Sequence, residues 1–460
     1  MAKKEKRTIS DFLDKEYRAY SLYVAQNRAL PSMIDGMKTG ARKIMHSAFK
    51  GSLKNGDQKK VPNLAGETLN FALYPHGEIS LYGTIITMSQ RHKFNLNPLY
   101  IDSQNGTLRS DAAASPRYLY VRLSEFADLW KTDSDLLEYI YDEGQYIEPK
   151  YFMPIIPVVL CQRQQGMAPG YAYNSMSYNP IDIIDLMLEN LNNKKTKKEI
   201  TIHPFIRGIN SKLWKYDGDT NQWVNSGVAK WDEKKRTITV TDLPYDQTYD
   251  SFEKLLNKFV ENGDIRDWKN MSTDTKIEYI IDCKRSKFGN SLGTSKSKTT
   301  LNRIYNKFKL VHAAPRDLLY VIDNENKVRH FNTPEELIEA FLDFRLDVYK
   351  SRKKLLLKNL NEMLVKNDEL VKFITLVCSG KLKIRNRPMA ELKADMDANK
   401  LNIALINTPM SKVTKEERDK IIKESENIRK QIEKITKTTE REMYVNDLKE
   451  LRDRLAKEFE

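Results

Sequence analysis

The spacing of apolar residues predicts a series of short helices near the start of the chain. Ser10 and Asp11 are suited to cap the first helix, which should stop near Pro31 because proline disfavours helix in the residue before it. The apolar and aromatic residues of this helix are Phe12, Leu13, Tyr17, Tyr20 and Val24. A second helix is expected over residues 40–49.

Two further helices are predicted over residues 63–72 and 78–89, with the turn Tyr74-Pro75-His76-Gly77 between them. The apolar stripe of the second is Ile79, Tyr82, Ile85 and Ile86. Helix, glycine-containing turn and helix form the layout of a helix-turn-helix module, which puts its second helix against DNA. An ordinary pair of core helices has the same pattern, so both interpretations stay open at this point.

The pattern changes twice in the rest of the chain. Residues 151–160 are apolar but contain two prolines, which favours buried extended chain over helix. From about residue 195 to residue 330, alternation such as Ile238 with Val240 predicts a separate α/β region. After a capping sequence at Thr333-Pro334, the chain is mostly helical, and a long helix over residues 415–437 suggests an antiparallel coiled-coil arm. A plain helical domain is the alternative for this last part.

Composition and charge narrow the class of protein. The chain has 460 residues, enough for about three domains, and no apolar run long enough to span a membrane. Its net charge is +14, and residues 1–60 alone hold 14 Lys and Arg against 6 Asp and Glu. This surplus favours a nucleic-acid partner over a merely solubilising surface. Three distant cysteines, and an N-terminus that lacks a secretory signal, fit a reducing cytoplasm.

The candidate chemistry lies at Arg117-Tyr118, after the small residues Ala112-Ala113-Ala114. A phenol is a poor nucleophile at neutral pH because its pKa is about 10. A neighbouring guanidinium can stabilise the phenolate and can also bind a phosphate through its fork of donors. Such a pair suits attack on a phosphodiester, although Arg-Tyr dipeptides are common and carry little weight alone.

Four motifs in a fixed order add weight. They are Arg28-Ala29-Leu30-Pro31-Ser32-Met33-Ile34-Asp35-Gly36-Met37-Lys38, Tyr74-Pro75-His76-Gly77, Ala112-Ala113-Ala114 with Arg117-Tyr118, and Gly166-Met167-Ala168. Together they resemble the DNA breakage-reunion subunit of type IIA DNA topoisomerases, the gyrase A class, over nearly the whole chain. Within this class the likeness is closest to the medium subunit of the topoisomerase of tailed phages.

The resemblance implies an α+β multidomain fold. Residues 1–175 would form a winged-helix cleavage domain, residues 176–330 a tower-like α/β domain, and residues 331–460 a coiled-coil arm with a helical dimer gate. It also implies roles for eight residues. Tyr118 is the expected nucleophile, Arg117, Arg28 and His76 its catalytic partners, Lys38, Arg42 and Lys43 DNA-binding residues, and Met167 an apolar wedge that bends DNA.

The chain departs from the family pattern at several positions. Tyr74 stands where the family has the first His of a His-Pro-His-Gly motif, and Gln162-Arg163 replaces an Asn-Gly pair. The glycine-rich stretch before the tyrosine is reduced to residues 102–106. Ile79 and Gly83 correspond to quinolone-contacting positions of bacterial relatives, so we expect a weak response to these drugs.

The expected reaction is a transesterification that leaves a 5′-phosphotyrosyl link. In the family Mg²⁺ assists the leaving oxygen. The acidic pairs here, Asp217-Gly218-Asp219 and Asp395-Met396-Asp397, look like solvated faces, and no nucleotide-binding loop is present. We therefore expect no metal ligands in this chain, and a large partner subunit that carries the Toprim domain with its Mg²⁺ and the ATPase.

Two tyrosines are needed to cut a duplex, so the resemblance also implies a homodimer on double-stranded DNA. The lack of a propeller-like C-terminal extension favours relaxation and decatenation over active supercoiling. The enzyme would work in the cytoplasm, or in the host cytoplasm or nucleoid if a phage encodes it. The alternatives are a non-catalytic DNA-bending protein, a tyrosine recombinase and a structural coiled-coil protein. A DNA-bending protein gives Arg117-Tyr118 no role. A recombinase needs a tyrosine late in the chain, whereas Tyr118 lies in the first third. A coiled-coil protein leaves the first 330 residues unexplained.

Overall fold

The computed structural model describes residues 8–51, 53, 57–192, 200–209, 214–218, 222–273, 276–383, 387–409 and 413–459. The N-terminal segment 1–7 and Asp219, considered above, lie outside these ranges. The chain forms two compact units, Met1–Leu342 with Leu451–Glu460, and Asp343–Glu450. In the described part of the chain, no helix combines the length and apolar character needed to cross a membrane.

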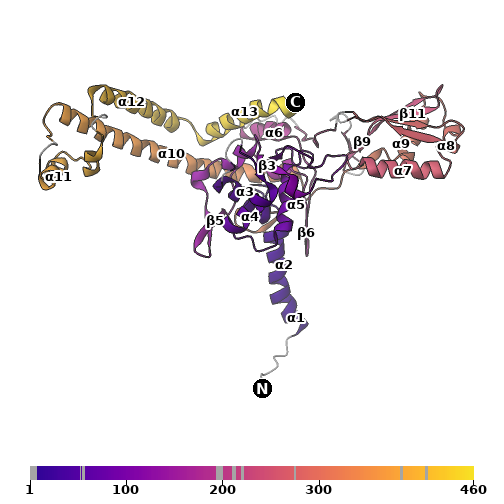
Figure 1. Ribbon diagram of the computed structural model, residues 1–460, viewed down its shortest axis with the longest axis horizontal. Helices are drawn as coiled ribbons and strands as arrows, with labels where there is room; N and C mark the ends of the chain where they lie inside the picture. Colours follow the sequence, from indigo (N-terminus) through magenta and orange to yellow (C-terminus); the bar gives the residue numbers. More distant parts are fainter. Residues whose placement is uncertain are drawn as a thin grey trace, which may run out of the picture. The chain divides into compact units, whose positions relative to one another are not determined.

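The first unit opens with a continuous helical run that ends at Ala29, as predicted (Figure 1). Its segments are α1 (Ile9–Phe12), the π-helical η1 (Leu13–Tyr17), α2 (Arg18–Val24) and the π-helical η2 (Ala25–Ala29). The predicted cap was wrong. Thr8, not Ser10, caps the helix, because its hydroxyl accepts from the backbone N–H of Asp11 while the Asp11 carboxylate accepts from the Thr8 N–H.

The three helices that follow lie close to their predicted ranges and pack together (Figure 1). They are α3 (Thr39–Lys50), α4 (Val61–Phe71) and α5 (Glu78–Ser89), and beside them lies the antiparallel sheet β1 (Lys59–Lys60), β3 (Tyr120–Leu123) and β2 (Leu99–Ile101). This combination has the layout expected of a winged helix. The predicted stripe of α5 was wrong at Ile79, which is 80% exposed, since Leu81, Ile85 and Met88 face the core instead.

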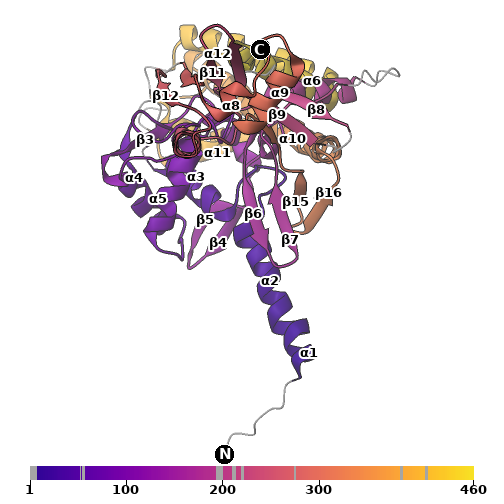
Figure 2. The ribbon, with the colours of Figure 1, turned by 90° about the vertical axis from the view of Figure 1, so that its right-hand side faces the viewer.

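The chain then passes through short elements to a sheet that joins distant segments. The short elements are η3 (Pro116–Tyr118), η4 (Ala127–Lys131), η5 (Ser134–Leu136), the hairpin β4 (Tyr139–Asp142) and β5 (Gln145–Pro149), and η6 (Val158–Cys161). Residues 151–157 are extended and mostly buried, as predicted, but residues 158–160, also predicted as extended, belong to the helical turn of η6. The sheet has the order β16 (Val328–Phe331), β15 (Leu318–Ile322), β7 (Tyr171–Asn174) and β6 (Gln165–Ala168), and Figure 2 shows its four strands side by side. The predicted domain boundaries at 175 and 330 separate strands that share this sheet, and they stay a prediction.

The α/β region has its own core. After α6 (Pro180–Leu191) come a small sheet and a larger antiparallel one. The small sheet is β14 (Val311–Ala313), β9 (Gln222–Ser226) and β8 (Trp214–Asp217), and the larger, the β10–β13 sheet, has the order β10 (Val228–Asp232), β11 (Thr237–Asp242), β13 (Tyr279–Asp282) and β12 (Asp267–Asn270). The accompanying helices are α7 (Tyr249–Glu261), α8 (Lys287–Asn290) and α9 (Lys298–Lys307). The predicted alternation is confirmed, because Ile238, Val240 and Ile281 are buried in one cluster with Phe252 and Phe308.

The second unit is helical. Its elements are most of α10 (Pro334–Cys378), α11 (Met389–Ala398), η8 (Ile403–Asn407), α12 (Lys415–Lys437) and the start of α13 (Glu440–Phe459). Within this unit Tyr349 stacks on Tyr444, whereas Asp368, further along α10, pairs with Arg429, earlier in the chain. A position further along α10 thus contacts a position earlier in the α12–α13 segment. This segment therefore runs antiparallel to α10, as expected of the arm. A compact cluster lies at the far end of α10, formed by Phe373, Ile374, Leu382, Met396, Leu401 and Ile421.

A buried histidine in α3 makes stability depend on pH. The rings of His46 and Tyr139 meet edge to face at 5.9 Å, and the Nε2 atom of His46 has no hydrogen-bond partner among the described residues. Burial, helped by the nearby charges of Lys50 and Lys43, lowers the pKa of His46 to about 4. His46 therefore binds a proton near pH 6.5 in the unfolded chain but only near pH 4 in the folded chain. The free energy of unfolding consequently decreases as the pH falls from about 6.5 to about 4.

We predict that His46→Gln weakens the acid sensitivity of folding. Between pH 7 and pH 4 the unmodified chain should lose about 3 kcal/mol more unfolding free energy than the variant, since that is the value of the gap between the two pKa values. Chemical unfolding at a series of pH values measures the difference. Parallel pH profiles for the two proteins would show that His46 is not the titrating group.

Candidate functional site

The loop between η2 and α3 is built on a buried carboxylate. Asp35 is fully buried, and its side chain accepts hydrogen bonds from Arg42 Nε at 2.7 Å, Phe152 N at 3.1 Å and Met37 N at 2.9 Å. Trp130 Nε1 donates to the Asp35 carbonyl at 3.0 Å. Burial alone would lower the pKa of Arg42, but the Asp35 carboxylate outweighs it and raises that pKa. The loop that follows Arg28 and precedes Lys38 is therefore held by three residues outside it and by one bond within it.

The neighbouring lysine is engaged in the same way. Lys43 Nζ donates to Glu148 Oε2 at 2.8 Å and to the Ala72 carbonyl at 2.5 Å, and both charged side chains are buried. The charged groups of Arg42 and Lys43 thus already have buried partners. Their expected contact with the DNA backbone stays a prediction, and the buried ion pairs favour a structural role for both.

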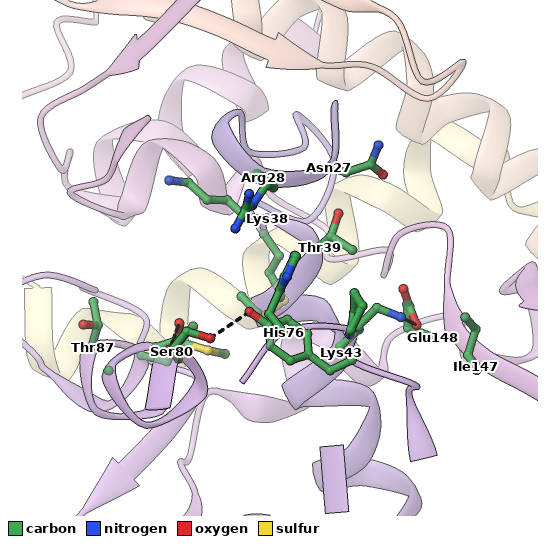
Figure 3. A pocket seen from close by; sticks show the side chains of 18 of the residues that line it. Asn27, Arg28, Lys38, Thr39, Lys43, His76, Ser80, Thr87, Ile147 and Glu148 are labelled. Atoms are coloured by element: carbon green, nitrogen blue, oxygen red, sulfur yellow. Dashed lines mark hydrogen bonds and ion pairs between the residues drawn. The ribbon is translucent and has the colours of Figure 1, made fainter. Parts of the chain in front are cut away.

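Four of the residues expected in the site share one open cavity of about 840 Å³. Its walls come from η2, α3, the turn before α5, α5 itself and the β4–β5 hairpin, and Figure 3 shows the side chains around it. The four are Arg28, Lys38, Lys43 and His76. Three lining carboxylates, Asp142, Glu143 and Glu148, lie on or beside the hairpin. Because Lys43 is already paired with Glu148, the side chains of the basic wall that could meet an anion such as a phosphate are Arg28, Lys38 and His76.

His76 is braced by the tyrosine that departs from the family motif. The rings of Tyr74 and His76 meet edge to face at 5.4 Å. The Ser80 hydroxyl donates to the Gly77 carbonyl at 2.9 Å, so the Tyr74 hydroxyl is the donor in its own 3.0 Å bond to Ser80. Tyr74 thereby positions the histidine and joins the turn to α5.

The candidate wedge is fixed against the end of η2. Met167 is 86% exposed on β6, in the hairpin with β7. The preceding Gly166 lies so close to η2 that a Cβ atom there would be 1.9 Å from the Ala29 carbonyl oxygen. Lys38 Nζ donates to the Gln165 carbonyl at 2.7 Å, and burial lowers its pKa. Met167, Arg28 and Lys38 are therefore mechanically linked.

The Arg117-Tyr118 pair lies elsewhere in the same unit. Both residues belong to η3, Tyr118 is 64% exposed, and the guanidinium lies 4.9 Å from the centroid of the phenol ring. This is a cation–π distance. Neither residue is among the described residues that line the cavity. The structure thus brings Arg28, Lys38, Lys43 and His76 together and leaves the tyrosine and its arginine outside.

Residues 28–451 match the family model for the A subunit of DNA gyrase/topoisomerase IV. The chain belongs to this family. It is 29% identical to the mitochondrial DNA topoisomerase 2 of Dictyostelium discoideum over 98% of its own length, and 30% identical to DNA topoisomerase 2 of Arabidopsis thaliana over 85%. It spans only 35% and 26% of those relatives.

A solved structure supports the fold. The crystal structure of the Plasmodium falciparum topoisomerase II DNA-binding, cleavage and re-ligation domain matches with a TM-score of 0.82 and 22% identity, over 97% of this chain and 65% of that one. The α+β topoisomerase II fold expected from the sequence, with a long helix α10, is confirmed.

Of two buried acidic residues that the sequence reasoning did not single out, one carried a weak signal in the sequence and the other carried none. Asp35 stands alone among apolar residues within the first motif, which hints at a buried charge, and Gly36 after it has a φ of +67°. Glu148 follows Ile147 in a hairpin strand and meets Lys43 across 105 positions of sequence. No local pattern announces that ion pair, so it was missed.

The described residues do not fit a resident magnesium site. No group of three or more His, Cys, Asp or Glu side chains among them is arranged to hold a metal. Of the acidic pairs considered above, Asp395 pairs with Arg387 at 2.5 Å, and Asp217 lies in β8.

Gly166→Ala tests the close contact that holds the wedge. The added methyl group meets the Ala29 carbonyl, so we expect a loss of about 1–3 kcal/mol of unfolding free energy and weaker bending of bound DNA. Thermal unfolding and end-to-end fluorescence transfer on a labelled duplex measure the two effects. Gly66→Ala is the matched control, because Gly66 lies in α4 with open space around it and should be neutral or stabilising. Equal behaviour of the two variants would contradict the contact.

Arg42→Gln and Arg28→Gln should separate structure from DNA contact. The first leaves Asp35 without its ion-pair partner and should destabilise the fold by about 3–5 kcal/mol, without changing the salt dependence of DNA binding. The second removes an exposed cation, so stability should change little while the slope of log K against log salt falls by about 0.9. A reduced slope for Arg42→Gln would show that Arg42 does reach a phosphate.

Proposed function

We propose that the chain is the DNA-cleaving and rejoining part of a type IIA topoisomerase. It would make a transient double-strand break, pass a second duplex through it, and so relax or decatenate DNA. The observation that carries the proposal is the exposed Arg117-Tyr118 pair in the same winged-helix region as a basic cavity. Membership of the gyrase and topoisomerase IV family and the net charge of +14 support it.

In the proposed reaction the Tyr118 hydroxyl oxygen attacks a backbone phosphorus. The new bond joins phosphorus to the phenol oxygen, the bond to the 3′-oxygen breaks, and the phenolic proton ends on the released 3′-hydroxyl. Arg117, already against the phenol ring, would stabilise the phenolate. The phosphotyrosyl ester keeps the energy of the broken bond, so the reverse attack reseals the strand without an external energy source.

We further propose that the reacting phosphate enters the cavity of a second copy of the chain. Arg28, Lys38 and His76 line the cavity, whereas Tyr118 in the same chain does not. The cations would oppose the charge that builds on the phosphoryl oxygens, where removal of one donor typically costs about 2.7–4 kcal/mol. Met167 would bend the duplex at the same place by wedging between base pairs.

A partner subunit completes the proposal. The family uses Mg²⁺ and ATP, and the described residues offer no metal site of their own. We propose that a large subunit with a Toprim domain and an ATPase supplies both, that the cluster at the end of α10 forms a dimer gate, and that the chain is the medium subunit of a tailed-phage enzyme. The last point is supported by the sequence resemblance alone.

Tyr118→Phe should abolish covalent attachment to DNA. The full assembly, mixed with labelled duplex and Mg²⁺ and then denatured, should retain label on this chain only when the hydroxyl is present. Binding to intact DNA should stay within about twofold, because the ring and Arg117 remain. Label that survives on the Phe variant would end the assignment of Tyr118 as the nucleophile.

Mixed dimers test whether the two parts of the site come from different copies. A dimer of one Tyr118→Phe chain and one Arg28→Gln chain keeps one complete site if tyrosine and cavity belong to different copies, and none if they belong to the same copy. We expect single-strand cleavage, with the DNA attached to the Arg28→Gln chain. Both variant homodimers serve as controls. A mixed dimer as inactive as these homodimers would mean that each chain uses its own cavity.

A further inference from the structure

The segment that leads to the proposed nucleophile is ordered by hydrogen bonds within it and by one from Gln90. We call residues 102–115 the tyrosine loop. Gln90 Nε2 donates to the Asn105 carbonyl at 2.6 Å. Gly106 has a φ of +88°, and a Cβ atom there would be 2.7 Å from the Asp111 carbonyl oxygen, so only glycine fits. The N–H of Ala114 donates to the Gln104 carbonyl at 2.8 Å and closes the loop just before η3.

Arg109 anchors this loop to the β10–β13 sheet. It is 6% exposed, and its fork reaches the segment between β11 and α7. Its Nη1 donates to the carbonyls of Pro244 at 2.5 Å and Gln247 at 3.0 Å, its Nη2 to the Leu243 carbonyl at 2.7 Å and Asp242 Oδ1 at 3.1 Å, and its own carbonyl accepts from Tyr249 N at 3.1 Å. No other part of the tyrosine loop is as buried and as fully bonded among the described residues.

Two weaker holds tie the loop to the end of α5 and the residues after it. In the first, Gln90 Nε2 donates to the Asn105 carbonyl and Asn105 Nδ2 donates to Ser89 Oγ at 3.1 Å. The second is an ion pair. Asp111 pairs with Lys93 Nζ at 2.9 Å and His92 Nε2 at 3.3 Å, both just after α5, but its side chain is half exposed. Exposed ion pairs contribute little, whereas a buried arginine with four acceptors fixes both position and orientation. The geometry of the loop relative to β11 and α7 therefore depends mainly on Arg109.

We infer that Arg109 is a positioning residue for Tyr118, which ties the tyrosine to the base of the β10–β13 sheet. The inference rests on the proposed function. A displacement at Arg109 passes through the closed loop to η3, because only Ser115 lies between the closing Ala114–Gln104 bond and the tyrosine's short helix. A misplacement of about 1 Å at a reacting atom can lower a rate about 100-fold, without changing how tightly the rest of the substrate binds.

The test compares Arg109→Gln with Arg109→Lys in the full assembly. We expect the Gln variant to form the covalent adduct about 10 to 100 times more slowly at saturating DNA, with a Kd within about twofold of the unmodified protein. Lys keeps the charge but cannot reach all four acceptors, so it should recover part of the rate. Hydrogen exchange should accelerate over residues 104–118 in proportion to the lost rate.

Arg452→Gln is the matched control, because the fork of Arg452 binds Asp185 at 2.6 and 3.1 Å and joins α13 to α6, away from the tyrosine loop. Its adduct rate should be unchanged. An unchanged rate in Arg109→Gln, or the same slowing in the control, overturns the inference. If Arg109→Gln fails to fold, Asp242→Asn, which weakens one of the four bonds, should still slow the adduct about threefold or more.

The loop and the proposed function can fail separately. Adducts that persist in Tyr118→Phe would end the assignment of Tyr118 as the nucleophile, but they would not affect the hydrogen-exchange result at residues 104–118. Faster hydrogen exchange in Arg109→Gln with an unchanged adduct rate would instead leave Tyr118 assigned as the nucleophile and would show that Arg109 does not position it.

Discussion

Asp35 is buried without exposed surface, and its carboxylate binds Arg42 and two backbone N–H groups. An unpaired charge at this depth would be strongly destabilising, so the folded loop requires the Asp35 carboxylate and its three donors to be in place together. The loop between η2 and α3 consequently has one conformation, with Arg28 before it and Lys38 after it. The placement of Arg28 and Lys38 beside the cavity is thus a result of folding.

A second constraint connects this part of the cavity to the candidate wedge. Gly166 touches the Ala29 carbonyl, and Lys38 reaches back to the Gln165 carbonyl. Bending of DNA by Met167 and capture of a phosphate by Arg28 would therefore occur at a fixed spacing. A duplex that cannot bend there would not bring its phosphate to the cavity, so the deformability of DNA, not its base edges, would govern where it is cut.

Local patterns in the sequence predicted the helices and strands whose formation depends on residues close together in the chain. The ranges of α3, α5 and α12 and the alternation of β11 and β13 came from periodicity, because each element buries one face. Periodicity placed Ile79 in the core, where tertiary packing exposes it. The ion pairs that engage Arg42 and Lys43, and the separation of Tyr118 from the cavity, involve contacts that no local pattern records. The resemblance supplied the residue types of the site, but not which of their charges were already paired.

The separation of the tyrosine from the cavity explains why the loop before it is so firmly held. In the proposed reaction the cavity of the second copy orients the phosphate, so it cannot also orient the tyrosine before the copies and the DNA have come together. An exposed phenol on a loose loop would lose conformational entropy at that moment, which would slow the step. Arg109 and its four acceptors restrict the loop in advance. The chain thus carries two preorganised halves of a site, and the dimer has only to align them.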